Sequence, residues 1–285
     1  MGTGSGTGTG SWTIDQPDRL ALDGEVKRLA VNLVHGRLNV VGTDGPARVE
    51  ITALGTKPLT VTLDDSGTLT VVHEDVPKWP GIFWLLFGRR YRADVSIAIP
   101  QHVPAALNVV SGSIVASSLR SGARVDMTSG RITLLGLDGK ISAKLVSGPI
   151  EALNIGGELE LETVSGEITL ADSTVSRVRA RTISGSLTCD LDNPPEHSDI
   201  RLETTSGEIT ARVREDSDLQ VFLHCVSGRV TTAFAELEPA GAKSVSGRLG
   251  RGTGQLHASA TSGNIALLRR PVDYDDLEVD EDIDS

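Results

Sequence analysis

The chain has 285 residues, enough for one large all-β domain or two ordinary domains. Its formal net charge is −11, but eight acidic residues fall within residues 273–285, and the remainder carries 27 basic against 30 acidic residues. This nearly neutral body lacks the basic surface that binds nucleic acid, so we expect no nucleic-acid partner. Aromatic residues make up only 3 % of the chain, so small and β-branched side chains must fill the core.

The first twelve residues, MGTGSGTGTGSW, have neither a basic n-region nor an apolar h-region, which predicts no secretory signal. No stretch reaches the ~18–20 apolar residues of a membrane-spanning helix. The two cysteines, Cys189 and Cys225, are too few to cross-link a domain of this size, so we expect a reducing cytoplasm and buried free thiols. Residues 1–11 are predicted to be a flexible Gly/Thr/Ser leader.

Residues 12–104 are predicted to form a β-rich N-terminal cap. Strands are expected at residues 29–34, 38–41, 49–53, 59–63, 69–73 and 91–99. His35-Gly36-Arg37 joins the first two and is a degenerate copy of the corner described below, and residues 64–67 predict a hairpin turn. Such a region would cover the unpaired backbone at the end of a stack of strands.

An apolar loop interrupts the cap region at residues 78–92. It holds five of the nine aromatic residues of the chain, in a continuous apolar run with basic flanks. Two interpretations stay open: a hydrophobic plug over the end of the fold, or a contact with an anionic membrane surface or a protein partner. The candidate contact residues are Trp79, Ile82, Phe83, Trp84, Leu85, Leu86, Phe87, Arg89, Arg90 and Arg92.

A Ser-Gly motif recurs nine times within residues 105–270. A β-branched residue precedes each serine, and an aliphatic residue follows three positions after it. Successive serines are 18, 18, 18, 19, 22, 21, 19 and 16 residues apart, which predicts stacked coils of one repeating unit. The motifs are Ser111 and Gly112, Ser129 and Gly130, Ser147 and Gly148, Ser165 and Gly166, Ser184 and Gly185, Ser206 and Gly207, Ser227 and Gly228, Ser246 and Gly247, and Ser262 and Gly263.

Apolar and polar residues alternate along each repeat, as in a half-buried strand. The positions four and two before each serine are predicted to face inward, with the serine on the same side, and so are the positions three and five after it. The glycine supplies the corner where the pattern inverts, because it adopts a positive φ or a bulge without steric cost. In the early coils a second glycine, at positions 122, 139 and 157, opens a second strand.

These patterns predict an all-β fold: a single-stranded parallel β-solenoid, similar to a β-helix, with about two strands per 18-residue coil over residues 105–270. Residues 193–195 and 215–217, in the longest coils, are predicted to be loop insertions at corners. The acidic tail 271–285 has too few apolar residues to fold and is predicted to be disordered.

Four segments resemble a bacterial β-strand-repeat family of unknown function that is adhesin-like and toast-rack shaped. They are GRLNVVG at residues 36–42, RVEI at 48–51, VSIAIP at 95–100 and LNVVSGSI at 107–114, and the resemblance covers about residues 28–268. Family members often carry export signals or membrane anchors and are often associated with envelope-stress proteins, whereas no export signal is predicted here. The resemblance implies a structural motif and no catalytic residues.

The candidate chemical groups favour a structural interpretation. A serine nucleophile needs a base that is held by a third group, and the six histidines share no repeat phase. The serines are therefore interpreted as a corner ladder whose hydroxyls bond to backbone. The outward carboxylates scatter among lysines and arginines, as on a solvated face; they are Glu151, Glu162, Glu167, Glu203 and Glu208. We expect no enzymatic activity, cofactor or metal.

Two outward rows are candidate surfaces. The β-branched residue before each serine is interpreted as strand propensity, with an apolar stripe for lateral assembly as the alternative. A threonine row four residues after the serines is similar to an ice-binding array, but charged neighbours such as Arg131 interrupt it; its members are Thr133, Thr169, Thr188, Thr210 and Thr231.

The sequence therefore predicts a non-catalytic structural or binding scaffold in the cytoplasm, peripheral at the inner membrane face, and the resemblance implies a link to envelope maintenance. Loop 78–92 would contact a protein partner or an anionic membrane surface. The alternatives are a self-assembling solenoid filament or oligomer, and a carbohydrate-binding protein or surface adhesin.

Overall fold

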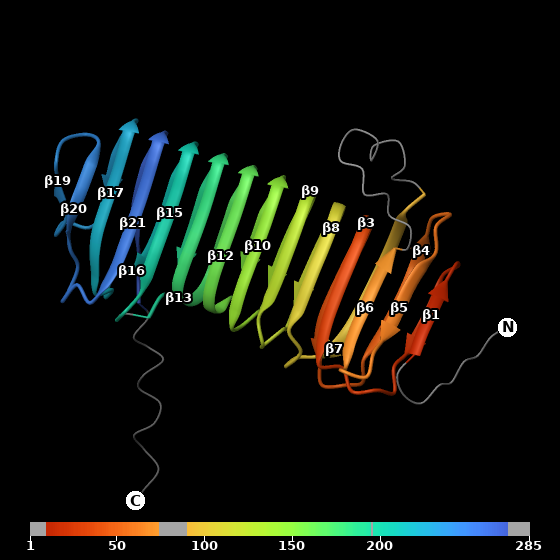
Figure 1. The fold of residues 1–285 in the computed structure, drawn as a ribbon. Helices are drawn as coiled ribbons and strands as arrows, with labels where there is room; N and C mark the ends of the chain where they lie inside the picture. Colours follow the sequence, from red (N-terminus) through yellow and green to blue (C-terminus); the bar gives the residue numbers. More distant parts are fainter. Residues whose placement is uncertain (1–9, 74–89, 195, 273–285) are drawn as a thin grey trace, which may run out of the picture.

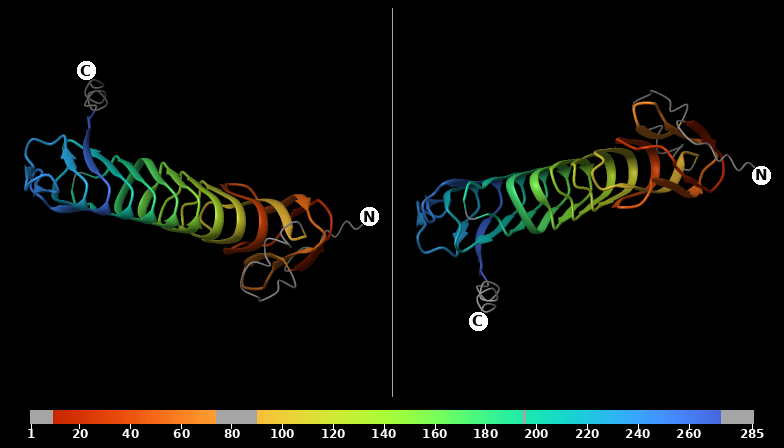
Figure 2. Two further views of the ribbon diagram at one scale, coloured as in Figure 1. Left: turned by 90° about the horizontal axis from the view of Figure 1, so that it is seen from above. Right: turned by 90° about the horizontal axis from the view of Figure 1, so that it is seen from below.

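The computed structural model describes residues 10–73, 90–194 and 196–272. These residues form 22 β-strands with connecting turns and no helix, so they contain no helix able to cross a membrane. The strands lie side by side in a long narrow rod whose two layers enclose the core (Figure 1; Figure 2). The described chain is thus all-β and β-solenoid-like.

The central part of the rod is a stack of parallel rungs whose Ser-Gly corners lie in register. Ser111 pairs with Ser129 and Ser129 with Ser147. Ser147 pairs in turn with Ser165, and Ser165 with Ser184. These rungs comprise β8 (Ala105–Ser117), β9 (Ala123–Leu135), β10 (Lys140–Ser147), β11 (Ile150–Leu153), β12 (Gly156–Ser165), β13 (Ile168–Ser184) and β14 (Leu187–Leu191).

The sheet closes on itself, because the chain turns at each corner and contributes to both layers. β9 continues round the corner at Ser129, and β13 continues round the opposite edge of the rod at Asp172. The pairings β9–β10, β10–β12, β12–β13, β13–β11 and β11–β9 form a closed ring of five parallel strands. A closed sheet leaves no open edge along the length of the rod.

The last rungs do not follow the order of the chain. β21 and β22 insert between the rung of β15 and β16 and the rung of β17 and β18 (Figure 1). Ser262 is therefore the register partner of both Ser206 and Ser227, and the prediction that each corner lies over the preceding one is wrong here. The strands are β15 (Asp199–Ser206), β16 (Ile209–Arg214), β17 (Leu219–Ser227), β18 (Val230–Thr232), β21 (Gly254–Ser262) and β22 (Ile265–Arg270).

The motif at Ser246 is the one predicted corner that does not join the stack. β20 (Ser244–Arg248) runs antiparallel to β17 and places Ser246 opposite Phe222, and β19 (Glu238–Pro239) pairs antiparallel with β20. The preceding residues 240–243 are exposed and include Gly241 at φ 84°, so no long inward-facing strand leads into this motif. β19 and β20 instead cover the end of the rod (Figure 1).

The other end shows the same arrangement. β3 inserts between β8 and the pair β6 and β7, with His35 and Gly36 beside Ser111 and Gly112. Antiparallel strands cover this end: β4 pairs with β7, β2 with β4, β5 with β6, and β1 with β5. The strands are β1 (Gly10–Ile14), β2 (Asp18–Ala21), β3 (Arg28–Thr43), β4 (Arg48–Leu54), β5 (Leu59–Leu63), β6 (Thr68–His73) and β7 (Arg92–Pro100).

One continuous core runs through the rod and across residue 104, so the predicted cap region and the repeats share it. The hairpin turn predicted between β5 and β6 is confirmed, since Gly67 N–H donates to Asp64 O at 3.0 Å. The inward rows are also confirmed: Ala143, Leu145 and Ile150 are at most 2 % exposed. The largest fully buried side chains are leucine and isoleucine, as the scarcity of aromatic residues requires.

Candidate functional site

At the Ser-Gly corners, the backbones of neighbouring rungs lie very close together. Gly148 has φ 128°, and a Cβ added to it would lie 1.8 Å from the carbonyl oxygen of Gly130 on the neighbouring rung. The same clash, at 1.8 to 2.1 Å, recurs at each stacked corner, so only glycine fits. The ladder follows the spatial order Gly36, Gly112, Gly130, Gly148, Gly166, Gly185, Gly207, Gly263 and Gly228.

The corner serines face outward, so the prediction that they share the inward side is wrong. Seven are exposed, and Ser111 and Ser246 are half-buried. The pattern inverts at the serine itself, because the chain turns there and leaves two consecutive outward residues. None of the nine has a side-chain hydrogen bond within the described part of the chain, so the predicted hydroxyl ladder is absent there.

Inward threonines, which the sequence reading did not single out, bond the corners instead. Thr182 Oγ1 donates to the carbonyl oxygen of Gly166 at 3.3 Å, and Thr204 Oγ1 donates to that of Gly185 at 3.2 Å. These two bonds join the corners at Gly166 and Gly185 to the inside of the next rung, whereas Thr163 Oγ1, at the same position of an earlier rung, has no partner among the described residues. A polar residue two positions before the serine is the sequence signal for them.

The outward carboxylates alternate with cations from rung to rung. Lys144, Glu162, Arg181 and Glu203 are successive register partners on one face. Lys144 Nζ lies 2.8 Å from Glu162 Oε2, and Arg181 Nε lies 3.8 Å from Glu203 Oε2. In the layer that follows the corners, Glu151 of β11 forms an ion pair with Arg131 of β9. These exposed pairs each contribute little to stability, but they place a cation beside each of these carboxylates.

A shallow groove of about 860 Å³ runs along this face beside the corners. One side of the groove is lined by the charged row that includes Lys144 and Glu162. The other side is lined by the residues that directly precede the corner serines. Val146, Val164 and Ile183 are 50 %, 45 % and 48 % exposed. The groove extends from β6 and β3 to β13, and its apolar lining includes Val34, Val72, Val110, Val146, Val164 and Ile183. The outward β-branched row is therefore an apolar wall over these rungs.

His73 lies at the β6 end of the groove. It is 2 % exposed, and its ring meets Tyr91 edge-on at 5.7 Å between centroids. Burial lowers the pKa of His73 from 6.5 to about 4, so the ring is neutral near pH 7. Among the described residues, neither ring nitrogen of His73 has a hydrogen-bond partner. An unpaired buried imidazole is costly and calls for an explanation.

Most of loop 78–92 lies outside the described residues. Of the ten predicted contact residues only Arg90 and Arg92 are described. Arg90 is exposed, and Arg92 forms an ion pair with Asp94 at 2.9 Å in β7. The other eight, Trp79, Ile82, Phe83, Trp84, Leu85, Leu86, Phe87 and Arg89, fall within residues 74–89. The membrane or partner contact of this loop stays a prediction.

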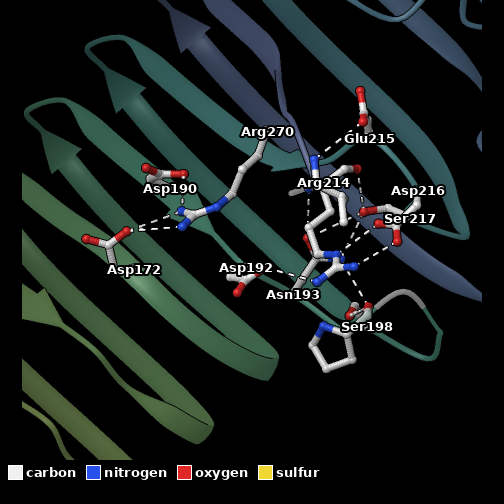
Figure 3. A network of polar contacts seen from close by, with 12 residues as sticks. Asp172, Asp190, Asp192, Asn193, Ser198, Arg214, Glu215, Asp216, Ser217 and Arg270 are labelled. Carbon is white, nitrogen blue, oxygen red and sulfur yellow. Dashed lines mark hydrogen bonds and ion pairs between the residues drawn. The ribbon is translucent and has the colours of Figure 1, made fainter. Parts of the chain in front are cut away.

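The opposite edge of the rod carries a polar network near its C-terminal end (Figure 3). Arg270 of β22 reaches Asp190 at 3.0 Å and Asp172 at 3.2 Å. Hydrogen bonding to Arg212 holds the pKa of Asp190 below its usual value. Arg214 pairs with Asp216 at 2.8 Å. The ion pairs of Arg270 join β22 to β13 and β14, beyond the β16 strand with which β22 pairs.

The predicted loop insertions meet beside this network. Asn193 and Ser217 are buried, and Asn193 Nδ2 donates to Ser217 Oγ at 3.1 Å (Figure 3). The backbone N–H of Arg214 donates to Asn193 Oδ1 at 3.3 Å. The insertions are therefore polar packing between neighbouring rungs, with their buried groups paired.

The cysteines, the threonine row and the search for metal ligands complete the set of candidate groups. Cys189 and Cys225 are free and buried, as predicted, and burial raises the pKa of Cys189 to about 12. The threonine row is broken by Glu151, the register partner of Thr169, and by Ala266, the partner of Thr210. Residues 10–73, 90–194 and 196–272 contain no group of three or more ligands suited to a metal ion.

Comparison with known proteins gives a family and a set of similar folds. A family model described as Toastrack DUF4097 matches residues 39–268. A Clostridium sporogenes "putative cell adhesion protein" shares 13 % identity at a TM-score of 0.31, covering 90 % of this chain and 100 % of that one. A Bacteroides fragilis "putative adhesin" shares 12 % at 0.37, covering 92 % and 98 %. A Parabacteroides distasonis "putative lipid binding protein" shares 10 % at 0.40, covering 90 % and 97 %. No curated protein matches.

Proposed function

The chain belongs to the Toastrack DUF4097 family, and from that premise we propose that it is a non-catalytic, adhesin-like binding scaffold. Its frame is a rigid β-solenoid with about two strands per 18-residue coil, and its work is to present one outward face. The observation that carries the proposal is the glycine ladder, in which a Cβ at any stacked corner would clash at 1.8 to 2.1 Å. A frame packed this closely holds outward side chains at fixed spacing.

The arrangement of the rod ends supports a scaffold. The first and last rungs in the sequence each lie between two others, so neither chain terminus forms an exposed end rung. Antiparallel strands cover both tips within the described residues. The outermost strands are short, five residues in β1 and two in β19, and short edge strands disfavour end-to-end growth into filaments.

The chemistry of the face supports binding without catalysis. The corner serines make no side-chain hydrogen bond among the described residues, and a serine nucleophile needs a base in contact. His35, the register partner of Ser111, is likewise not hydrogen-bonded to it in this part of the chain. The alternating charges from Lys144 to Glu203 make a patterned polar strip suited to recognising another surface.

A binding panel tests the proposal. The full chain is immobilised on a biosensor and exposed to phosphatidylglycerol vesicles, peptidoglycan and mucin. We expect saturable binding to one of these surfaces that is weakened in Lys144→Ala/Arg181→Ala. The control, Arg131→Ala/Arg229→Ala, removes equal charge beyond the corners and should bind normally. Binding to a polysaccharide alone would favour the carbohydrate-binding alternative, and equal loss in both variants would contradict recognition by this face.

The non-catalytic part has its own test. Chromogenic acyl, glycosyl and phosphoryl esters are incubated with the wild type and with Ser147→Ala. We expect no turnover above buffer for either protein. Turnover by the wild type that disappears with Ser147→Ala would overturn the proposal.

Self-association is a second candidate, favoured by one observation. Phe222 and Val226 on β17 are 51 % and 57 % exposed, the most exposed large apolar side chains of the described chain. An apolar pair of this kind suits a lateral contact between two rods. Sedimentation velocity over a hundredfold range of concentration tests it: association should disappear in Phe222→Ser/Val226→Ser, and an unchanged wild-type monomer at every concentration rules it out.

Cellular location is part of the proposal and is tested by fractionation of cells that express the full chain. A place at the inner membrane face with a part in envelope maintenance requires recovery in the cytoplasm or in a salt-releasable membrane fraction. Recovery in the cell wall or culture medium would favour a surface adhesin instead.

A further inference from the structure

The outward face of β10, β12, β13 and β15 carries three parallel rows of polar side chains that cross the rungs. In the two outer rows the sign of the charge alternates at every step. One outer row is Lys140, Glu158, Arg177 and Asp199, and the other is Lys144, Glu162, Arg181 and Glu203. Unlike charges on neighbouring strands stabilise a sheet, so the outer rows need no ligand to explain them.

The middle row breaks this alternation. Its members, in order across the rungs, are Ser142, Glu160, Arg179, Arg201 and His257. Arg179 and Arg201 are register partners on neighbouring strands, and both are exposed. Like charges in this position repel each other. Within these three rows, all of which are described, this is the one place where two cations are direct neighbours.

The nearby carboxylates compensate the two arginines only in part. Arg201 Nε lies 3.2 Å from Asp199 Oδ1, but Asp199 Oδ2 lies 3.7 Å from Arg177 Nε, so two cations share one carboxylate. Arg179 has neither a hydrogen bond nor an ion pair among the described residues, although Glu160 is its register partner. Its guanidinium group is therefore available to a ligand.

The next rungs add no negative charge to this region. The register partner of Arg201 on β21 is His257, and that of His257 on β17 is Phe222. Neither β21 nor β17 contains an aspartate or a glutamate. Residues 177–183 and 199–205 together carry four arginines and two carboxylates, in a chain whose net charge is −11. The positive charge is thus a local excess centred on Arg179 and Arg201.

The spacing of the two side chains suits one tetrahedral oxyanion. Neighbouring strands are ~4.8 Å apart, so both guanidinium groups can donate N–H groups to a single ion that lies between them. The two oxygens of a carboxylate match the fork of one guanidinium, whereas a phosphate or sulfate has oxygens for both.

We propose that Arg179 and Arg201 form a binding site for a phosphate or sulfate group, with His257 at its edge. The negative charge of the bound group would lie between the two cations and restore the alternation of the middle row. This goes beyond the proposed function and does not depend on it, because inorganic ions alone test the site. Phosphate and sulfate groups occur as free ions, in lipid headgroups and on polymers, and these carriers are compared below.

NMR of the arginine Nε–H groups tests the site directly. The full chain is titrated with sodium sulfate, and a sodium chloride series holds the ionic strength equal. The signals of Arg179 and Arg201, each assigned by its absence from the glutamine variant, should shift along one saturable curve. Arg179→Gln and Arg201→Gln should each weaken the affinity about tenfold. Arg201→Lys keeps the charge but lacks the planar fork, and should weaken it by less.

The matched control is Arg124→Gln. Arg124 belongs to the same middle row, as the register partner of Ser142, and already pairs with Asp126 at 2.9 Å. This variant removes one exposed positive charge, as Arg201→Gln does, and should bind sulfate like the wild type. Acetate should bind the wild type more weakly than sulfate.

Charge reversal provides an independent reading. Arg201→Glu makes the middle row alternate without a ligand, so its Tm at low ionic strength should be about 1–3 °C above that of the wild type. Sulfate should raise the Tm of the wild type above its value in chloride and leave that of Arg201→Glu unchanged. Equal responses to sulfate in the two proteins would overturn the proposal.

Co-sedimentation with phosphatidylglycerol vesicles and biosensor binding of dextran sulfate identify the carrier. A carrier whose binding falls in Arg201→Gln but not in Arg124→Gln supplies the group, and binding of inorganic sulfate alone assigns the free ion. Sulfate shifts of equal size at all exposed arginines would indicate a diffuse ion atmosphere and overturn the proposal. So would equal affinity of Arg201→Gln and the wild type, or acetate that binds as tightly as sulfate.

Discussion

Replacing Gly148 with alanine adds one carbon atom at the tightest point of the rod. That Cβ would lie 1.8 Å from Gly130 O, whereas real contacts of this kind stay above 3.0 Å, so the two rungs must separate by about 1.2 Å. The bond from Ile132 N to Pro149 O at 3.1 Å joins these two rungs at this corner and would weaken. Losing this bond, worth ~1 kcal/mol, and adding ~1–3 kcal/mol of backbone strain gives a loss of about 2–4 kcal/mol.

The control is Gly136→Ala, at the opposite edge of the rod. Gly136 also has positive φ, 59°, but a Cβ there would be 3.9 Å from the nearest atom, in Asn154. It should cost only the ~1–2 kcal/mol of a left-handed alanine. Urea and thermal unfolding, followed by circular dichroism, should place Gly148→Ala about 3–6 °C below Gly136→Ala in Tm, at ~2–4 °C per kcal/mol. Equal destabilisation of the two variants would refute the close-contact argument.

Three further results are expected. Burial lowers the pKa of His73 from the 6.5 of the unfolded chain to about 4 in the fold. The free energy of unfolding is therefore at its full value above pH 6.5 and decreases as the pH falls toward 4, because only the unfolded chain binds the proton. Urea unfolding should show a loss of at most about 2.5 kcal/mol at pH 4.5, absent in His73→Phe, and a pH-independent wild type would contradict this. Cys189 should resist iodoacetamide at pH 8 until the protein is unfolded, because its pKa is about 12; rapid native labelling would show an open core. Arg270→Gln should cost ~1 kcal/mol and speed amide exchange in β21 and β22 by removing the bridge to Asp172 and Asp190; unchanged exchange would mean that the bridge does not hold the strand.

The sequence is sufficient to predict the repeating unit, because each unit carries its own signals. Alternation places Ala143 and Leu145 inward, and glycine is required at Gly148 whatever the neighbouring rung is. Cys189 also follows from its phase in the repeat. Local patterns of this kind depend on sterics within one or two rungs.

The order of the rungs could not be predicted in the same way. A Ser-Gly corner at 206 fits equally well against 227 or 262, because the inward residues of all corners are alike. The choice is fixed by contacts between distant residues, such as Arg270 with Asp172, 98 residues apart, and Arg251 with Asp218. The motif alone is also not enough to predict a rung. Ser246 has the motif, but the long inward-facing strand that a rung needs does not precede it.

A ladder of left-handed residues at the opposite edge was also missed. Ser118, Gly136, Asn154 and Asp172 recur at 18-residue spacing with φ between 47° and 59°. Each precedes a further inward residue, such as Ile155, which is 1 % exposed. Asparagine and aspartate tolerate this conformation, so Asn154 and Asp172 were the available signal, but serine and glycine at the other two positions do not stand out.

Disulfide trapping of the corners tests the stacking account most directly. The exposed serines Ser206, Ser227 and Ser262 are replaced by cysteine in pairs, and the proteins are mildly oxidised as dilute monomers. Neighbouring rungs are ~4.8 Å apart and permit a disulfide, whereas rungs two steps apart, at ~9.6 Å, do not. Because Ser262 is the register partner of both other serines, Ser206→Cys/Ser262→Cys and Ser227→Cys/Ser262→Cys should cross-link and Ser206→Cys/Ser227→Cys should not. Cross-linking of the last pair, with none between 206 and 262, would show that the chain winds in sequence order and would contradict the account.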